Sequence, residues 1–211
     1  MILIGQFDSS FVRRVGIAMR LYGHAFEHRP WSVFADAQKV MAFNPLGRVP
    51  ILILDDGEVL ADSAAILDHL DDLARDGALI PRTGPDRRAA LRVVTLALGL
   101  AERGVALFYE RHLAEDPGPV LTRRLEERIS ATLAVLEADR NARRTPWWFG
   151  EDMGHADVAV ACALRHVADA LPDRWDEASH PALARHSATA EALPVFREIS
   201  QPFAGPGGPP V

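Results

Sequence analysis

Residues 44–50, Asn-Pro-Leu-Gly-Arg-Val-Pro, constrain the fold more than any other stretch of the chain. Prolines and a glycine this close together cannot continue a helix or a central strand, so they predict a fixed turn. Residues 51–54 follow as an apolar run that predicts a buried strand, and Asp55-Asp56-Gly57 is a hairpin signal. A rigid Val49-Pro50 step at the mouth of a strand can hold backbone polar groups open toward a ligand.

Hydrophobic spacing around this turn predicts alternating strands and helices over about 75 residues. The predicted strands are residues 1–6, 25–31, 51–54 and 58–60, and the predicted helices are residues 10–22, 34–42 and 63–74. Gly23 ends the first helix, and Pro30 marks the second strand as an edge strand or marks its end. The order β-α-β-(α)-β-β-α indicates an α/β domain over residues 1–76.

The strand signal vanishes after a Gly/Pro-rich linker at residues 77–86, and residues 87–201 are predicted to form an all-helical domain. Apolar residues at steps of three and four mark one long helix between Leu91 and Phe108 and a second between Leu121 and Leu136. Further predicted helices are residues 156–170, which are apolar enough for a buried central helix, 181–191 and 195–200. Residues 202–211, rich in proline and glycine, are expected to be a flexible tail.

Composition excludes several classes of function. The formal net charge of −6 argues against a nucleic-acid partner, because phosphate binding needs a basic face. Cys162 is the only cysteine, so no disulfide can form within the chain, which fits a reducing cytoplasm. The chain starts without a basic leader and no apolar run approaches the ~20 residues of a membrane span, so we expect a cytoplasmic protein without membrane contact. The histidines lack metal-ligand spacing, so no metal is expected.

Two interpretations compete for Ser9, which lies between the first predicted strand and the first predicted helix. As an N-cap, its hydroxyl would accept a hydrogen bond from an early backbone N–H and stabilise the helix by about 1 kcal/mol. Alternatively, the hydroxyl points at a ligand sulfur, because a helix N-terminus carries roughly half a positive charge and favours a thiolate over a thiol. The local residues favour the cap, whereas the distant Val49-Pro50 and Asp62-Ser63 elements favour the ligand.

Asp62-Ser63 begins the predicted helix at residues 63–74 and also has two interpretations. It is a helix cap, and it can be an anion site in which the first backbone amides and the Ser63 hydroxyl receive a carboxylate while Asp62 receives an ammonium group. An α-amino acid end carries both groups on one carbon. Val49-Pro50 is either an ordinary turn or a cis peptide that leaves the Val49 N–H and C=O free to pair with an extended peptide.

These elements, in this order, strongly resemble the glutathione S-transferase superfamily over nearly the whole chain. Residues 1–15 resemble the opening strand, catalytic turn and first helix of that family, and residues 44–50 with 56–66 resemble its glutathione-binding signature. Residues 150–157 resemble the start of the family's buried sixth helix, and residues 180–183 and 193–196 resemble its closing helices. The resemblance implies a thioredoxin-like domain with a mixed four-stranded sheet (βαβ-ββα), followed by an all-α helical bundle.

The resemblance also implies roles for individual residues in binding glutathione as a co-substrate. Ser9 stands where Ser-type members keep the residue that stabilises the glutathione thiolate. Val49, before a cis Pro50, would pair with the cysteinyl backbone, and Asp62 and Ser63 would hold the γ-glutamyl end. The residues expected to reach the glycine carboxylate are Arg48 and, with less support, Gln38 and Lys39.

Other expectations from the resemblance concern the second substrate and the assembly. In this family the first bundle helix faces the pocket for an electrophilic small molecule, which points to Arg103, Tyr109 and His112, although surface or core packing is the alternative for each. A homodimer is expected from the family alone. A role in detoxification follows from the same resemblance.

Four positions depart from the family pattern. Ser10 replaces the usual proline after the catalytic residue, which makes Ser10 a competitor of Ser9. Asp62 replaces the commoner glutamate and shortens the reach to the ammonium by one methylene. Gly154 stands where a serine or threonine usually caps the buried helix, which removes the reciprocal capping box with Asp157. His186 stands where an aromatic residue is common.

The leading hypothesis from these residues is a glutathione transferase, in which Ser9 and the helix dipole ionise the thiol for attack on an electrophile. The first alternative is a binding or regulatory protein of the same architecture without transferase activity, which the loss of the proline at Ser10 supports. The second is a glutathione-dependent isomerase, with which Arg13-Arg14 is compatible. A thiol-disulfide reductase is disfavoured because serine stands where those members need cysteine.

Overall fold

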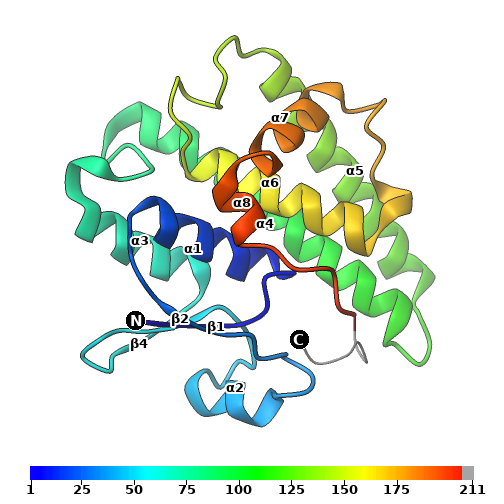
Figure 1. The fold of residues 1–211 in the computed structure, drawn as a ribbon. Coiled ribbons are helices and arrows are strands. Elements are labelled where there is room, and N and C mark those ends of the chain that lie inside the picture. Colours follow the sequence, from blue (N-terminus) through cyan, green and yellow to red (C-terminus); the bar gives the residue numbers. More distant parts are fainter. Residues whose placement is uncertain (206–211) are drawn as a thin grey trace. The chain divides into compact units, whose positions relative to one another are not determined.

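The computed structural model describes residues 1–205, apart from the side chain of Asp76. It divides into two compact units, drawn in Figure 1. The first unit comprises Met1–Leu79 together with the chain from Leu193 onward, and the second comprises Ile80–Ala192.

A four-stranded sheet in the order β2-β1-β3-β4 is the centre of the first unit. Its strands are β1 (Ile2–Ile4), β2 (Glu27–Arg29), β3 (Ile51–Ile53) and β4 (Val59–Ala61). β1 runs parallel to β2 and antiparallel to β3, and β3 runs antiparallel to β4. This topology confirms the predicted mixed sheet of a thioredoxin-like domain. The strand pattern of residues 51–54 and its hairpin signal are therefore read correctly from sequence.

Helices cover both faces of this sheet (Figure 1). α1 (Ser10–Leu21) packs against α3 (Ser63–Ala74) on one face, and α2 (Ala37–Phe43) lies on the other. Val40 of α2 is fully buried in a cluster with Ile4 and Ile51, one residue from each of the two central strands. A short 3-10 helix, Arg75–Gly77, follows α3.

The second unit is entirely helical over its described elements. It contains α4 (Gly84–His112), α5 (Pro119–Asn141), α6 (His155–Ala170), the 3-10 helix Pro172–Arg174 and α7 (Pro181–Glu191). α6 contacts α4 and α7, and nearly all its residues are buried, as its apolar sequence predicts. Cys162 lies in this helix and is buried. Within residues 1–205, no helix combines the length and hydropathy needed to cross a membrane.

The start of α6 shows how the chain tolerates the missing cap residue. Glycine has no side chain to cap with, yet the Asp157 carboxylate accepts a hydrogen bond from the Gly154 N–H at 2.9 Å and another from the Trp148 N–H at 2.7 Å. One half of the capping box therefore remains, and its carboxylate also ties the preceding loop to the helix. Burial raises the pKa of Asp157, and these two hydrogen bonds oppose that rise.

The structure differs from the predicted boundaries at both ends of the helical domain. α4 begins at Gly84, inside the predicted 77–86 linker, because a proline in the first turn is compatible with a helix start. α8 (Pro194–Glu198) and residues 199–205 group with the first unit, whereas the sequence pattern assigned residues 195–200 to the helical domain. Of the predicted tail, residues 206–211 lie outside the described residues.

Candidate functional site

Ser9 occupies the N-cap position of α1, but its side chain makes no capping hydrogen bond. Its backbone carbonyl accepts the first helical bond from the Arg13 N–H at 2.9 Å, so the helix start is formed without the hydroxyl. The first turn of α1 carries no acidic residue that would offset the positive end of the helix dipole. Ser9 is a half-buried residue, and a serine at such a helix start can offer its hydroxyl to a ligand anion.

Ser10, the competitor, differs from Ser9 in its surroundings. It is only 4% exposed, and its Oγ has no hydrogen-bond partner among the described residues. Because solvent reaches Ser9 but hardly reaches Ser10, a ligand has easier access to the Ser9 hydroxyl.

The turn before β3 is held by the side chain of Asn44. Its Nδ2 donates to the Arg48 carbonyl at 2.9 Å, and its Oδ1 accepts from the Leu46 N–H at 3.1 Å. The Val49-Pro50 peptide at the end of this turn is cis, as the resemblance implies. Within residues 1–205, the Val49 backbone N–H and C=O make no hydrogen bond, so both remain available to an extended peptide.

Gly5, at the end of β1, permits the close approach of Val49 to the first strand. Its φ of +126° is in a region that side chains rarely adopt, and a Cβ there would lie 2.5 Å from Val12 and 2.8 Å from Val49. The site therefore depends on a backbone position that only glycine fills.

Asp62 and Ser63 lie at the start of α3, as the sequence predicts. Asp62 has a φ of 74° and a ψ of 133°, an unfavourable conformation for a residue with a side chain, and its carboxylate accepts from the Ala64 N–H at 2.8 Å. The Ser63 hydroxyl is buried and lies 3.5 Å from Nη1 of Arg14. A costly backbone conformation at an exposed cap is the kind of outlier that marks a binding site.

The residues predicted for the glycine end of the tripeptide lie on the surface around α2. Arg48 and Gln38 are exposed, and Lys39 forms an ion pair with Asp36 at 2.7 Å while its Nζ lies 5.6 Å from the centre of the Trp31 ring. Lys39 is therefore engaged within the protein, whereas Arg48 presents an exposed guanidinium next to Val49.

The C-terminal segment holds the turn that carries Ser9, a feature that sequence reasoning missed. The Phe7 N–H donates to Oε1 of Gln201 at 2.9 Å, and the Ala204 N–H donates to the Asp8 carboxylate at 3.0 Å. Gln201 and Ala204 lie on either side of Pro202-Phe203 in a Pro/Gly-rich stretch, so the sequence pattern contains no signal for this contact.

Two family models match the chain: the glutathione S-transferase N-terminal domain over residues 3–78 and the glutathione S-transferase C-terminal domain over residues 119–189. The maleylacetoacetate isomerase of Pseudomonas aeruginosa is 30% identical over 211 residues, which cover 93% of this chain and 93% of that protein. The chain belongs to the glutathione S-transferase superfamily.

Solved glutathione S-transferase structures share this fold. That of Methylobacterium radiotolerans, in complex with glutathione sulfonate, has a TM-score of 0.89 at 30% identity and covers 97% of this chain and 95% of its own. That of Methylobacillus flagellatus, with GSH bound, has a TM-score of 0.87 at 27% identity, and the match covers 96% of this chain and 99% of that chain. Among sequence relatives, the GST-like protein YibF of Escherichia coli is 28% identical over 170 residues, or 78% of this chain and 81% of that protein.

The residues suggested for the second substrate of this glutathione S-transferase homologue all lie on α4, but they do not share one face. Nine positions separate Arg103 from His112, which at about 100° per residue places the two side chains on opposite sides of the helix. His112 stacks on Phe108, with ring centroids 4.3 Å apart, and Tyr109 is 37% exposed. Arg103 lies 3.6 Å from the carboxylate of its neighbour Glu102. Tyr109 and His112 remain candidates on one flank of α4.

The described residues hold no metal centre. Across residues 1–205, no three His, Cys, Asp or Glu side chains lie close enough together to bind an ion.

Proposed function

We propose that the protein is a glutathione transferase that binds glutathione along the first unit. The Val49 backbone pairs with the cysteinyl residue, and Asp62 with Ser63 receives the γ-glutamyl ammonium and carboxylate. The exposed Arg48 would meet the glycine carboxylate. Support comes from the open Val49 backbone, the strained Asp62 at a helix start, and superfamily relatives whose solved structures hold glutathione or its sulfonate.

Ser9 is proposed to stabilise the thiolate of bound glutathione. A free thiol has a pKa of about 8.5, and a hydroxyl donor at the positive end of α1 would lower it. The thiolate attacks the electrophilic carbon, a carbon–sulfur bond forms, the leaving group departs with its electron pair, and the thiol proton passes to solvent. The observation that carries this assignment is that the Ser9 side chain sits at the N-cap position of α1 but makes no capping hydrogen bond.

Substitution of the two serines tests this proposal. We expect Ser9→Ala to lower kcat for conjugation of chlorodinitrobenzene at pH 7 by up to about tenfold, the largest effect that a rise of one unit in the thiol pKa can have on the thiolate fraction, while calorimetry shows little change in glutathione affinity. Ser10→Ala should leave conjugation nearly unchanged. Unchanged turnover in Ser9→Ala would remove Ser9 from this role, and no heat with glutathione together with no activity would favour the non-catalytic alternative.

A second candidate, glutathione-dependent isomerisation, is favoured by the names of several relatives. Proteins named maleylacetoacetate isomerase in Pseudomonas aeruginosa and Rhizobium meliloti are 30% and 34% identical, the latter over 47% of this chain. In isomerisation the thiolate adds to an activated double bond, the single bond rotates, and the thiolate is expelled, so glutathione is regenerated. Assay with a maleylacetone-type substrate and a thiol titration separates the two reactions, because only conjugation consumes thiol in proportion to product.

Assembly and location stay predictions. A homodimer would give twice the 23.1 kDa chain mass in light scattering. Fractionation of the producing cell tests the expected cytoplasmic location.

A further inference from the structure

We propose that a basic pocket in the helical unit binds a phosphate-type oxyanion, either free phosphate or the phosphate group of a small metabolite. The pocket has a volume of about 190 Å³ and is formed by the end of α5, the turn after it and α7. Arg140, Arg143, Arg144 and Arg185 line it, and no acidic residue does. Because these residues all belong to the second unit, the proposal does not rest on the proposed glutathione chemistry.

The acidic side chains on the neighbouring elements are committed to other partners, and Glu191 of α7 pairs with Arg165 at 3.7 Å. Asp139 pairs with Arg143 at 3.1 Å and accepts from the Trp148 indole N–H at 2.9 Å. Glu137 accepts from two backbone N–H groups at the start of α7, both at 2.9 Å. Asp157 is buried and caps α6. The pocket therefore keeps an excess of positive charge.

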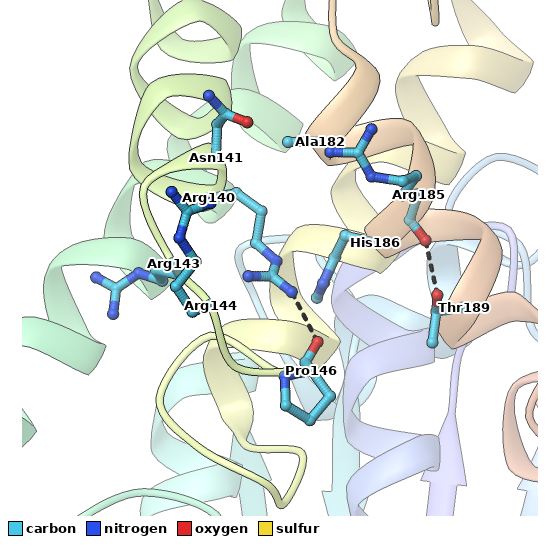
Figure 2. A pocket seen from close by; sticks show the side chains of 9 residues that line it. All are labelled: Arg140, Asn141, Arg143, Arg144, Pro146, Ala182, Arg185, His186 and Thr189. Atoms are coloured by element: carbon cyan, nitrogen blue, oxygen red, sulfur yellow. Dashed lines mark hydrogen bonds between the residues drawn. The ribbon is translucent and has the colours of Figure 1, made fainter.

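Arg140 is held at the edge of the pocket by hydrogen bonds, but one of its N–H donors has no partner among the described residues. Its Nη2 donates to the carbonyls of Thr145 and Pro146 at 3.0 and 2.7 Å, the latter drawn in Figure 2. Its Nε is buried without a hydrogen-bond partner among the described residues. Burial lowers the pKa of Arg140, the charge of Asp157 opposes this, and the nearby charges of Arg143 and Arg185 lower it further. A bound anion would relieve this repulsion.

Two further arginines have unpaired guanidinium groups among the described residues. Arg144 and Arg185 are exposed, and within residues 1–205 neither guanidinium makes a hydrogen bond or ion pair. Figure 2 shows Arg140 and Arg185 approaching from α5 and α7 on two sides of His186. Asn141, also in the lining, adds a neutral amide donor.

The number of donors favours a phosphate group over a carboxylate. One guanidinium fork satisfies both oxygens of a carboxylate, whereas a phosphate group presents three terminal oxygens and can engage several forks. The volume is below the ~300–1,000 Å³ of pockets for drug-sized ligands, so the occupant is small.

Titration calorimetry of the full chain at constant ionic strength tests the proposal with three probes: inorganic phosphate, glycerol 3-phosphate and succinate. Arg185→Gln removes one unpaired lining cation, and the control Arg124→Gln makes the same charge change at an exposed α5 position outside the pocket. We expect Arg185→Gln to raise the Kd for phosphate or its ester by about tenfold, the loss of a charge-assisted hydrogen bond. Arg124→Gln should change it less than about twofold.

Each outcome either identifies the ligand or overturns the proposal. Tighter binding of inorganic phosphate assigns the pocket to the free ion, and tighter binding of glycerol 3-phosphate assigns it to a phosphorylated metabolite. The proposal is overturned if neither probe binds, if succinate binds as tightly as phosphate, or if both arginine variants weaken binding equally. Arg144→Gln repeats the test at a second exposed position should Arg185→Gln prove unstable in a thermal melt.

Discussion

Nε of Arg13, near the start of α1, donates a 2.8 Å hydrogen bond to the carbonyl of Ile199, 186 residues away. A second donor of the same guanidinium, Nη2, reaches the Phe196 carbonyl at 2.8 Å, and Arg13 is only 2% exposed. This buried cation therefore donates hydrogen bonds to carbonyls at the C-terminal end of α8, where the negative end of the helix dipole lies. The contact anchors residues 193–205 to the first unit.

Arg13→Ala should destabilise the protein by about 3 kcal/mol, because two carbonyls lose hydrogen bonds from a charged group in a buried site. Urea denaturation measures the loss. Arg20→Ala is the matched control on the same helix, since Arg20 pairs with Glu198 of α8 at the surface, and it should cost about 1 kcal/mol or less. Equal losses in the two variants would show that the Arg13 contact is not a specific anchor.

Gly5→Ala should destabilise the first unit by more than 2 kcal/mol, since the added methyl must displace Val12 and Val49 and also adopt an unfavourable φ. Gly23→Ala is the control: its φ is also positive, but nothing lies within 4 Å of its Cβ, so only about 1 kcal/mol should be lost. Thermal melts distinguish the two. If Gly5→Ala lowers the melting temperature no more than Gly23→Ala does, the contact of Val49 with β1 leaves room for a methyl group at position 5.

Local patterns predicted most of the fold because its elements follow short-range rules. The hairpin at Asp56-Gly57 and the buried face of α6 were readable from turn chemistry and apolar spacing. The placement of residues 193–205 was not readable, since it depends on a buried arginine that binds backbone carbonyls far away in the chain. Carbonyls belong to every residue, so no sequence pattern marks them as partners.

The candidate site shows the same limit. Ser9, Val49 and Asp62 could be proposed from sequence because each sits at a helix start or turn that the sequence marks. The support of the Ser9 turn by Gln201 was missed, because a single glutamine before a proline has no distinguishing pattern. The opposite positions of Arg103 and His112 on α4 follow from their spacing alone, so this separation could have been derived.

Asp62→Asn should separate glutathione binding from stability. Asparagine caps helices as well as aspartate, so the hydrogen bond from the Ala64 N–H and the melting temperature should be kept. The carboxylate that would receive the γ-glutamyl ammonium is lost, so the Kd for glutathione should rise about tenfold or more. Calorimetry and a thermal melt on the same sample measure both. Unchanged affinity would place the ammonium elsewhere.

His186 occupies a position where the family commonly has an aromatic residue, and its surroundings are aromatic. Its ring meets Trp147 and Trp148 edge to face, with centroids 5.9 and 5.3 Å away, and it is buried. Burial lowers the pKa of His186 from 6.5 to about 4, the Asp157 carbonyl opposes this, and the charge of Arg140 adds to it. The imidazole is therefore neutral at pH 7 and packs as an aromatic ring.

The lowered pKa of His186 predicts a loss of stability in mild acid. Between pH 6.5 and about 4 the unfolded chain takes up a proton at His186 that the folded chain does not, so unfolding becomes easier as the pH falls, by up to about 3 kcal/mol. The raised pKa of Asp157 acts in the opposite direction, since its folded state holds a proton more readily than the unfolded chain. His186→Phe keeps an aromatic ring for the edge-to-face packing, loses the 3.3 Å hydrogen bond between Nε2 and the Asp157 carbonyl at every pH, and removes the histidine titration. Urea denaturation from pH 7.5 to 4 should therefore show the free energy of unfolding of the variant rising relative to that of the wild type as the pH falls. If the difference between the two proteins does not change with pH, the pKa of His186 is the same in the folded and unfolded states.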